Sequence, residues 1–372
     1  MTVSHVIIAA NSLTDGDFMQ TILKNENDAD TFDLASEILR KGGLVAFPTE
    51  TVYGLGGDAL QKDASKKIYS AKGRPSDNPL IVHIADRDAL NVLAAEIPEK
   101  AWILAEAFWP GPLTIILKKK CIVPDETTGG LDTVAIRMPS HPAALRLIKE
   151  SGIYIAAPSA NTSGRPSPTT AAHVMEDMNG RIDMIIDGGP VGIGIESTIV
   201  DLTGEVPTIL RPGFITKKLL EELIGPVEID KAILTPDPKM RPKAPGMKYT
   251  HYAPKGKLTI VEAEDANDYE KIAAHINKLT GEASSDGKNA VVITTEKHKS
   301  MYSCENIITL GDTQQSPTVA ARLYSALREC DDIGADVIYS ESFEDNEIGG
   351  AIMNRLLKAA GHRIIYLRKE TI

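Results

Sequence analysis

The sequence is poor in cysteine and has no long hydrophobic run. Its three cysteines, Cys121, Cys304 and Cys330, are scattered and odd in number, which argues against a disulfide framework and leaves no metal-ligand spacing. No stretch of about 18 apolar residues is present, so we expect no membrane span. The first residues lack the basic region of a signal peptide. We therefore expect a cytoplasmic protein that keeps its thiols reduced.

Positive charge is also in short supply. The chain carries a net charge of −11, and acidic residues outnumber basic ones both before and after Lys257. A protein that binds nucleic acid broadly needs a basic surface to displace counterions from the phosphates. The composition therefore disfavours nucleic-acid binding as the main role, although it is compatible with a local basic pocket.

Familiar catalytic and nucleotide-binding patterns are missing as well. No Ser/His/Asp triad or Cys/His pair can be argued from the spacing of these residues. The part after residue 257 has neither Gly-x-Gly-x-x-Gly nor Gly-x-x-x-x-Gly-Lys-Ser/Thr, so it shows no nucleotide site of its own.

The chain does have enough apolar residues for two domains. Its 372 residues exceed one typical domain, and its hydrophobic content of 42% is that of a globular protein. Over residues 1–225, strands and helices alternate but several strands follow one another, which predicts an α/β domain with a twisted mixed sheet and surrounding helices. Over residues 258–372, regular alternation predicts a smaller, acidic, Rossmann-like parallel α/β domain. Residues 226–257 form a Pro/Tyr-rich linker.

The predicted elements follow from apolar periodicity and from Gly and Pro breaks. The predicted helices span 31–41, 63–73, 86–95, 98–108, 142–150, 169–178, 216–224, 267–279, 317–330 and 348–360. The predicted strands span 44–47, 80–84, 113–117, 133–137, 153–157, 183–187, 197–202, 207–211, 258–262, 290–294, 306–309, 336–339 and 364–367.

The stretch Pro48–Gly56 is the strongest candidate for a site. It follows the apolar strand 44–47 and contains Thr49, Glu50 and Thr51, with glycines at 54, 56 and 57. Proline ends strand pairing, and glycine lets the backbone bend close to a ligand. Hydroxyls at a strand end are typical of a ligand site in an α/β sheet.

Basic residues stand at comparable positions. Lys72 and Arg74 flank one glycine in a proline-restricted loop, and Arg137 and Arg211 each end a predicted strand. Arginine binds phosphate and carboxylate groups with two parallel hydrogen bonds, so these cations favour a polyanion, such as a nucleotide, or a carboxylate. For any one of them alone, an ordinary surface salt bridge is the competing interpretation.

Other polar residues are open to two interpretations. The segments Pro158–Gly164 and Glu196–Thr198 place hydroxyls and an amide at strand boundaries, where such groups bind phosphates but also make ordinary turns. His83 lies in an apolar strand, where a histidine is more often a satisfied core residue than a catalyst. Glu50 is the best-placed carboxylate, but a structural role is equally supported. The glycine-rich run 188–194 can lie over a ligand.

The linker has its own character. Pro245–Pro254 carries two tyrosines, a histidine and a lysine. A passive linker is rich in Gly and Ser or in charge. We therefore expect this segment to contact other parts of the protein.

Five ordered motifs resemble the YrdC family, in the long two-domain form that makes threonylcarbamoyl-AMP. They are GLVAFPTETVYGLG (43–56), KGRPSDNP (72–79), PSAN (158–161), EST (196–198) and LRPG (210–213). The resemblance covers essentially the whole chain. It implies a nucleotidyltransferase that joins L-threonine, bicarbonate or CO2, and ATP into L-threonylcarbamoyladenylate and releases pyrophosphate. Mg²⁺ is implied as a cofactor held mainly by the ATP phosphates, with no direct protein ligand.

The same resemblance implies partners and residue roles. A tRNA threonylcarbamoyl-transferase complex receives the product, and direct tRNA binding is weak or absent. Lys72 and Arg74 are the implied catalytic residues. The residues implied to bind threonine are Thr51, His83, Arg137, Ala157 and Ser197. The residues implied to bind ATP are Lys72, Arg74, Asn78, Thr133, Ser159, Asn161, Ser167, Arg211 and Tyr252.

Elementary chemistry agrees with this assignment. Carbamate formation and adenylation need positioned reactants and neutralised phosphate charge more than a protein nucleophile. Both intermediates hydrolyse, so a lid that excludes water is useful, and the segment around Tyr249 to Tyr252 is the candidate. An RNA-binding module without adenylate synthesis is the alternative, which the acidic charge opposes. A carbamoyl-transfer enzyme of hydrogenase maturation shares a YrdC-like domain but carries further modules that are absent from this sequence.

Overall fold

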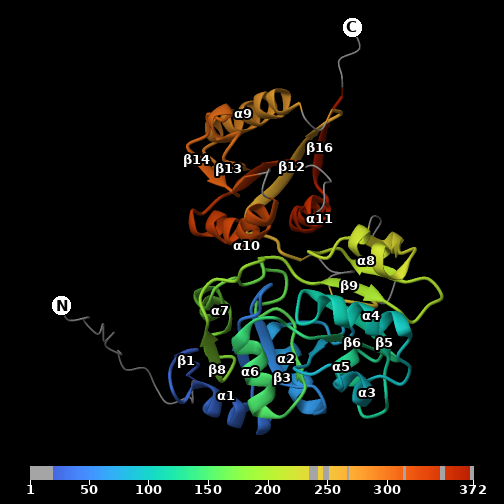
Figure 1. Cartoon of the computed structure of the whole chain (residues 1–372). Helices are drawn as coiled ribbons and strands as arrows, with labels where there is room; N and C mark the ends of the chain where they lie inside the picture. Colours follow the sequence, from blue (N-terminus) through green and yellow to red (C-terminus); the bar gives the residue numbers. More distant parts are fainter. Residues whose placement is uncertain are drawn as a thin grey trace, which may run out of the picture.

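The computed structural model describes residues 20–233, 242–245, 251–265, 268–312, 316–343 and 348–368. These residues form two α/β domains, one on each side of a shared interface (Figure 1). Each domain is built on one sheet, of 11 strands in the N-terminal domain and 5 in the C-terminal domain. In the part of the chain that is described, no helix is both long and apolar enough to cross a bilayer.

The N-terminal domain contains β1 to β11 and α1 to α8. Its helices are α1 (Thr31–Arg40), α2 (Lys62–Lys72), α3 (Ala89–Leu93), α4 (Glu99–Phe108), α5 (Asp125–Thr128), α6 (Pro142–Ser151), α7 (Ala171–Met178) and α8 (Lys217–Ile224), followed by the 3-10 helix η1 (Lys231–Ile233). Its strands are β1 (Ile22–Asn25), β2 (Val45–Phe47), β3 (Gly54–Asp58), β4 (Ile81–His83), β5 (Leu113–Lys118), β6 (Thr133–Arg137), β7 (Ile155–Ala156), β8 (Met184–Asp187), β9 (Thr198–Asp201), β10 (Thr208–Arg211) and β11 (Glu228–Ile229).

The N-terminal sheet is mixed, as the sequence predicts. Its strand order is β1-β8-β2-β3-β7-β4-β6-β5-β9-β10-β11. β4 and β6 are parallel, and their register places His83 directly beside Arg137. β5 and β6 are antiparallel. The predicted strand ends that carry these two side chains are therefore neighbours in the fold.

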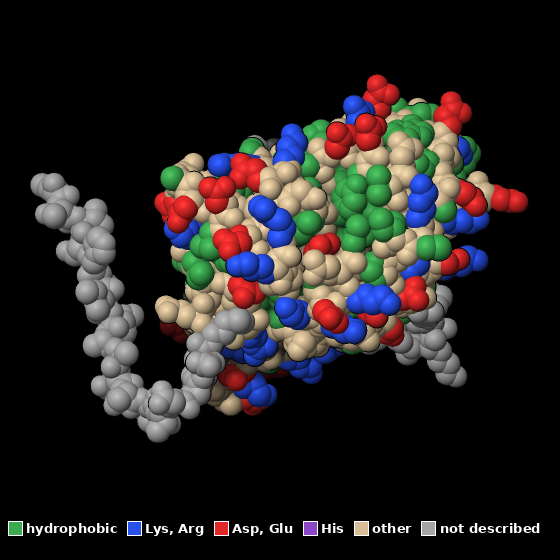
Figure 2. Space-filling model, turned by 90° about the horizontal axis from the view of Figure 1, so that it is seen from below, with side chains coloured by type: hydrophobic (Ala, Val, Ile, Leu, Met, Phe, Trp, Pro, Cys, Tyr) green, Lys and Arg blue, Asp and Glu red, His purple; other side chains and the backbone are tan. Residues whose placement is uncertain are grey.

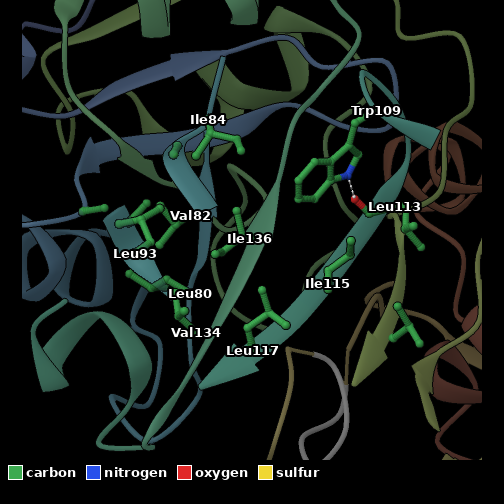
Figure 3. Close-up of a cluster of buried hydrophobic side chains, with 14 of the residues drawn as sticks. Leu80, Val82, Ile84, Leu93, Trp109, Leu113, Ile115, Leu117, Val134 and Ile136 are labelled. Carbon is green, nitrogen blue, oxygen red and sulfur yellow. Dashed lines mark hydrogen bonds between the residues drawn. The ribbon is translucent and has the colours of Figure 1, made fainter. Parts of the chain in front are cut away.

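The core beneath this sheet is apolar and continuous. Figure 3 shows Val82, Ile115 and Ile136 side by side with Trp109 and Leu113. The indole N–H of Trp109, which is buried, donates a 2.7 Å hydrogen bond to the Leu113 carbonyl oxygen, so its one polar group is satisfied. This packing gives the strands around the site a rigid base.

The glycines after Pro48 differ from one another in role. Gly54, Gly56 and Gly57 lie in the buried strand β3 and not in a bend over a ligand. A Cβ atom on Gly56 would lie 2.8 Å from side-chain carbons of both Ile155 and Phe47. The absence of a side chain there lets the sheet and core pack closely, so Gly56 serves packing, whereas Gly54, at the start of the strand, is the glycine that lies at the pocket described below.

The C-terminal domain is a parallel α/β unit, as predicted. Its sheet order is β14-β13-β15-β12-β16, and every pair is parallel. In Figure 1, α10 and α11 face the N-terminal domain and α9 lies on the far side of the sheet. The elements are β12 (Lys257–Ala263), α9 (Tyr269–Ser285), β13 (Ala290–Thr294), η2 (Lys299–Met301), β14 (Asn306–Thr309), α10 (Ser316–Asp332), β15 (Val337–Glu341), α11 (Gly349–Ala359) and β16 (Ile364–Leu367).

The two domains share a packed interface. Val52 and Ile195 of the N-terminal domain belong to the same apolar cluster as α10 and α11. Gly194 has φ 79°, and a Cβ there would lie 2.4 Å from the Ala321 Cα in α10, so only glycine allows this approach. Arg328, 2% exposed, donates a 2.9 Å hydrogen bond to Asp177 across the interface. Apolar contact and buried ion pairs therefore dock the domains together.

Several predicted boundaries shift. α3 is shorter than predicted, and α9 is longer than its prediction of 267–279. β1, β3, α5 and β11 were not predicted as elements. β11 pairs with β10, so the N-terminal sheet extends beyond residue 225 into the segment assigned to the linker. Tyr249 of the linker lies outside the described residues.

Candidate active site

One pocket gathers most of the residues that the sequence singled out. It lies where the Thr49–Gly54 turn, the ends of β4, β6 and β10, and the loop after β7 meet the linker. The implied site residues among its lining are Thr51, Lys72, Arg74, His83, Arg137, Ala157, Ser159, Asn161, Arg211 and Tyr252. Segments separated by up to two hundred positions thus converge on a single cavity.

Three other implied residues do not line the pocket but form hydrogen bonds with residues that do. Ser197 Oγ accepts from Arg211 Nη2 at 3.0 Å. The Asn78 carbonyl oxygen accepts from Arg74 Nε at 3.4 Å, while the buried Asn78 Oδ1 has no hydrogen-bond partner among the described residues. Ser167 Oγ donates to the Glu196 carboxylate at 2.7 Å. Each of them supports a residue of the pocket wall.

Thr133 is not brought to this lining. It begins β6, whereas Arg137 ends it, so the two are about 13 Å apart along the strand. Thr133 is therefore distant from Arg137, but the parallel register of β4 and β6, with Ile81 beside Ala135, puts it level with Pro79, whose carbonyl oxygen Arg74 binds.

The Pro48–Gly54 turn is held by its own hydroxyls. Thr49 Oγ1 donates to the Val52 carbonyl oxygen at 2.6 Å and lies 2.8 Å from Thr51 Oγ1. Thr51 is fully buried at the pocket wall. Local side-chain bonds of this kind fix a turn without regular pairing, so the turn presents Thr51 in one position.

Glu50 pairs with Arg137. Arg137 Nη2 lies 2.7 Å from a Glu50 oxygen, and the two side chains are only 5% and 13% exposed. The other Glu50 oxygen accepts the Ser140 backbone N–H at 3.1 Å. This pair orients the guanidinium at the end of β6, which is the structural role left open for Glu50.

His83 is both buried and at the pocket wall. It is 3% exposed, and its Nδ1 lies 3.1 Å from the Ile81 carbonyl oxygen. Burial, with a smaller effect of the Arg137 charge, lowers the pKa of His83 to about 3. The imidazole is therefore neutral near pH 7, which suits a hydrogen-bonding side chain and not a cation.

Lys72 holds the loop that follows β7. It is 3% exposed, and its ammonium group donates to the Ser159 and Asn161 carbonyl oxygens, both at 2.5 Å. Ser159 Oγ donates in turn to Asn161 Oδ1 at 2.6 Å. Burial, followed by the Arg74 charge, lowers the pKa of Lys72 well below its usual value. The loop and the lysine thus form one unit of the pocket wall.

Two arginines face the same cavity from other segments. Arg74 donates from Nη2 to the Pro79 carbonyl oxygen at 3.2 Å, and burial lowers its pKa to about 10. Arg211 donates from Nε to the Ser197 carbonyl oxygen at 3.0 Å. Burial lowers the pKa of Arg211 too, although the Glu196 charge opposes this shift. Both guanidinium groups remain cations at neutral pH.

Glu196 was not singled out from the sequence. It is 6% exposed and accepts hydrogen bonds from Ser167, Tyr324 and Arg355 at 2.7, 2.7 and 3.1 Å. Burial alone would raise the pKa of Glu196, but Arg355 and then Arg211 lower it to about 2. In the sequence, Glu196 is marked only by its place in the EST motif, and that motif was singled out for its hydroxyl side chains.

The linker enters the pocket through its last residues. Tyr252 has φ 66° and stacks on Tyr324 with ring centroids 5.0 Å apart. The Ala253 N–H donates to the Gly164 carbonyl oxygen at 2.8 Å. Burial raises the pKa of Tyr252 to about 12 and lowers that of His251 to about 3. The expected contact between the linker and the site is therefore present at these residues.

The pocket has an excess of positive charge. Lys72, Arg74, Arg137 and Arg211 line it, whereas the carboxylate in its lining, Glu196, is paired with Arg355, and Glu50 pairs with Arg137 from outside the lining. A buried cluster of this sign is suited to a ligand with several negative charges. Within the described ranges, no group of three or more His, Cys, Asp or Glu side chains is arranged to hold a metal ion.

Comparison with known proteins agrees with this geometry. Residues 37–213 match the Sua5/YciO/YrdC family model, which is described as "Telomere recombination", and residues 215–361 match "Threonylcarbamoyl-AMP synthase, C-terminal domain". The threonylcarbamoyl-AMP synthase of Bacillus subtilis is 52% identical over 89% of this chain and 93% of its own length. That of Pyrococcus abyssi is 50% identical over 89% of this chain and 94% of its own.

Solved structures give the same result. Pyrococcus abyssi Sua5 complexed with L-threonine superposes with a TM-score of 0.87 at 48% identity, over 93% of this chain and 99% of that chain. A variant of the same protein, in which a histidine and the tyrosine that follows it are replaced by alanine, has a TM-score of 0.88 at 46% identity, over 95% of this chain and all of that one. Fold, pocket and sequence agree, and the chain belongs to the threonylcarbamoyl-AMP synthase family.

Proposed function

We propose that this protein makes L-threonylcarbamoyladenylate from L-threonine, bicarbonate or CO2, and ATP, with release of pyrophosphate. The observation that carries the proposal is the convergence of Thr51, His83 and Arg137 with Arg74 and Arg211 in one pocket. The first group suits a small amino acid with a carboxylate, and the second suits a triphosphate. Relatives at about half identity bear the name of this activity.

Threonine occupies the side of the pocket near β4 and β6 in this proposal. Its carboxylate pairs with Arg137, whose guanidinium Glu50 already orients at 2.7 Å. Thr51, the neutral His83 and Ala157 surround the rest of the amino acid, and Ser197 supports this wall from behind. The amine must be neutral to attack CO2, and the bond formed is the N–C bond of a carbamate. The amine proton lost in this step passes to solvent.

ATP occupies the other side. Arg74 and Arg211 stabilise charge on the phosphates, while Ser159 and Asn161, held by Lys72, line the wall that the phosphates contact. Asn78 and Ser167 support this side from behind. Thr133, which does not line the pocket, and Tyr252 remain the implied nucleotide contacts that the proposal depends on least.

The chemical step needs no protein nucleophile. A carbamate oxygen attacks the α-phosphorus of ATP, a new P–O bond forms, and the bond between the α-phosphorus and the bridging oxygen breaks as pyrophosphate leaves. The protein lowers the barrier by holding the reactants in line and neutralising charge on the departing phosphates. Tyr252 and His251, already packed at the pocket, exclude water from the carbamate and the mixed anhydride.

Magnesium is proposed to enter with ATP. Glu196, in the pocket lining, and Glu50, next to it behind Arg137, are both engaged by arginines, so the donor set fits an ion coordinated mainly by phosphate oxygens and water. Bound in this way, the ion neutralises phosphate charge. We further propose that the protein acts in the cytoplasm and delivers its product to a tRNA threonylcarbamoyl-transferase complex.

The test is pyrophosphate release with each substrate omitted in turn. We expect release only when threonine, bicarbonate and Mg-ATP are all present, with threonylcarbamoyl-AMP detected by mass spectrometry. Release without threonine would contradict the proposal. Binding of tRNA without turnover would favour the RNA-binding alternative. On the face shown in Figure 2, basic and acidic side chains are interspersed and do not form a continuous basic surface, which opposes that alternative.

A further inference from the structure

The nucleotide side of the pocket depends on residues of the C-terminal domain. Arg355 in α11 and Tyr324 in α10 are both fully buried. Both bind the same Glu196 oxygen, Arg355 Nε at 3.1 Å and Tyr324 Oη at 2.7 Å. A carboxylate at the edge of one domain is therefore neutralised from the other.

Arg355 also joins two chain segments that carry pocket residues. Its Nη2 donates to the Glu196 carbonyl oxygen at 3.3 Å, and its Nη1 donates to the carbonyl oxygen of Pro212, the residue after Arg211. The two segments are tightly apposed, because a Cβ on Gly213 would lie 2.8 Å from the Glu196 carbonyl oxygen. The Arg355 guanidinium thus binds the backbone of both segments, at Glu196 and at Pro212.

The arrangement leaves the Arg211 guanidinium available to a ligand. In the described part of the chain, its hydrogen bonds go to the carbonyl oxygen and hydroxyl of Ser197, not to the Glu196 carboxylate. The carboxylate is directed instead toward Ser167, Tyr324 and Arg355. After burial and the charge of Arg355, the charge of Arg211 has the largest effect on the pKa of Glu196, so without its partners Glu196 would pair with Arg211 and remove that charge from the pocket.

Tyr324 adds a second connection. Its ring stacks on Tyr252, which lines the pocket, with centroids 5.0 Å apart, while its hydroxyl holds Glu196. One buried side chain of the C-terminal domain thus contacts both the carboxylate that borders Arg211 and the linker tyrosine. The charged and titratable groups around Glu196 in the described residues are Arg355, Lys358, Arg211, His251, Tyr252 and Tyr324.

We propose that Arg355 and Tyr324 are positioning residues for the nucleotide: they hold Glu196 away from Arg211, so that the Arg211 guanidinium is left to bind the phosphates of ATP. This inference rests on the proposed function for the identity of the ligand. It gives the C-terminal domain a defined part in the site, although none of the described residues of that domain lines the pocket.

The test compares Arg355→Met and Tyr324→Phe with the unchanged full chain. Mg-ATP and threonine affinities are measured separately by calorimetry, which needs no turnover. We expect Arg355→Met to weaken ATP binding about tenfold or more, as coupled residues of one network do, and to change threonine affinity less than about threefold. Tyr324→Phe, which removes one hydroxyl, should weaken ATP binding a few-fold.

A pH profile separates positioning from mere stability. In the unchanged protein, kcat/KM for ATP should show no ionisation of Glu196 above pH 5, because Arg355 and Arg211 keep the pKa of this carboxyl at about 2. In Arg355→Met, that pKa should rise, and kcat/KM for ATP, relative to the unchanged protein, should recover as the pH is lowered from 8 to 5, because protonation of Glu196 releases Arg211. A loss of domain stability alone would lower the rate by one factor at every pH.

Arg322→Met is the matched control. Arg322 lies in α10 like Tyr324, but its side chain is 42% exposed and pairs with Glu329 at the surface. We expect unchanged affinities for this variant. The proposal is overturned if folded Arg355→Met binds ATP within twofold of the unchanged chain, or if threonine and ATP affinities fall equally with parallel pH profiles. If Arg355→Met does not fold, Tyr324→Phe decides: unchanged ATP affinity overturns the proposal.

The experiment also separates this inference from the proposed function. ATP that binds normally but supports no threonine-dependent pyrophosphate release would contradict the function. Normal synthesis with ATP affinity insensitive to both variants would contradict only the role of Arg355 and Tyr324.

Discussion

The two arginine–carboxylate pairs of the pocket differ in where their partners come from. Arg137 and Glu50 both belong to the N-terminal domain, and their pair is 2.7 Å long at the end of β6. Arg355 and Glu196 belong to different domains, and their pair is 3.1 Å long behind Arg211. In the first pair the arginine faces the cavity, whereas in the second the carboxylate does. In the proposed assignment, the threonine side is thus built by one domain, and the nucleotide side needs two.

The largest expected effect comes from removing Arg137, the arginine of the pair that lies within the N-terminal domain. Arg137→Ala should lower kcat/KM for threonine on the order of 10²–10³-fold, because the substrate carboxylate loses its bidentate partner and Glu50 is left as an unpaired, mostly buried charge. Steady-state kinetics with each substrate varied measures the effect. ATP affinity should change far less. Equal losses for both substrates would show that the two sides are not separate.

The next largest effect is expected from Lys72, which holds the loop containing Ser159 and Asn161. Lys72→Met should cost on the order of 10²-fold in kcat, because the Ser159 and Asn161 carbonyl oxygens lose the ammonium group that fixes the loop. Lys66→Met in the same helix is the control, since Lys66 pairs with Asp63 at the surface and both side chains are exposed. A rate within threefold of the unchanged protein would remove Lys72 from the catalytic machinery.

Glu50→Gln tests whether Glu50 orients Arg137 for the substrate. The amide keeps the shape of Glu50 and one acceptor oxygen but loses the charge that holds Arg137. We expect the KM for threonine to rise about tenfold, as for the loss of a charge-assisted hydrogen bond, with the KM for ATP unchanged. A lower KM for threonine would mean that Glu50 competes with the substrate and does not orient Arg137.

The smallest expected effect concerns stability. His83 has a pKa of about 3 in the folded protein and about 6.5 when unfolded, so protons favour the unfolded chain as the pH falls below 6.5. Its contribution to stability is complete above pH 6.5 and is lost progressively toward pH 3. Between pH 6.5 and 5 this amounts to about 2 kcal/mol.

Urea unfolding of the unchanged protein and of His83→Asn at both pH values measures this term. The variant is expected to be less stable overall, because a buried side chain is replaced, but to lose about 2 kcal/mol less between pH 6.5 and 5. The difference between variants cancels the contributions of His141, His173 and His251, whose pKa values are also lowered. Parallel pH dependences would contradict a buried neutral His83.

Local signals made much of the fold predictable. Thr133–Arg137 was predicted with its observed bounds, because β-branched residues lie between clear breaks. α6 ends at Gly152, which adopts φ 68°, as a helix-ending glycine does. In contrast, β1 and β11 are short edge strands with exposed residues, so their sequences carry no burial pattern, and β3 is rich in glycine, which is unusual for a strand.

The site was predictable wherever a motif marked it. Lys72, Arg74 and Arg211 stand at turns or strand ends, and the structure brings them to one pocket. Glu196 escaped attention, because its role depends on Tyr324 and Arg355, which lie in helices with no unusual pattern. A buried pair between residues so far apart leaves no local trace, and only the packing of α10 and α11 against the N-terminal domain reveals it.

The separation of Glu196 and Arg355 along the chain, 159 positions, has a consequence for synthesis. At about 5–20 residues per second, a ribosome needs roughly 10–30 s to pass from one to the other. During that interval the N-terminal domain can fold while Glu196 still lacks its partner. The pocket wall around Arg211 is therefore completed only when α11 has emerged and docked.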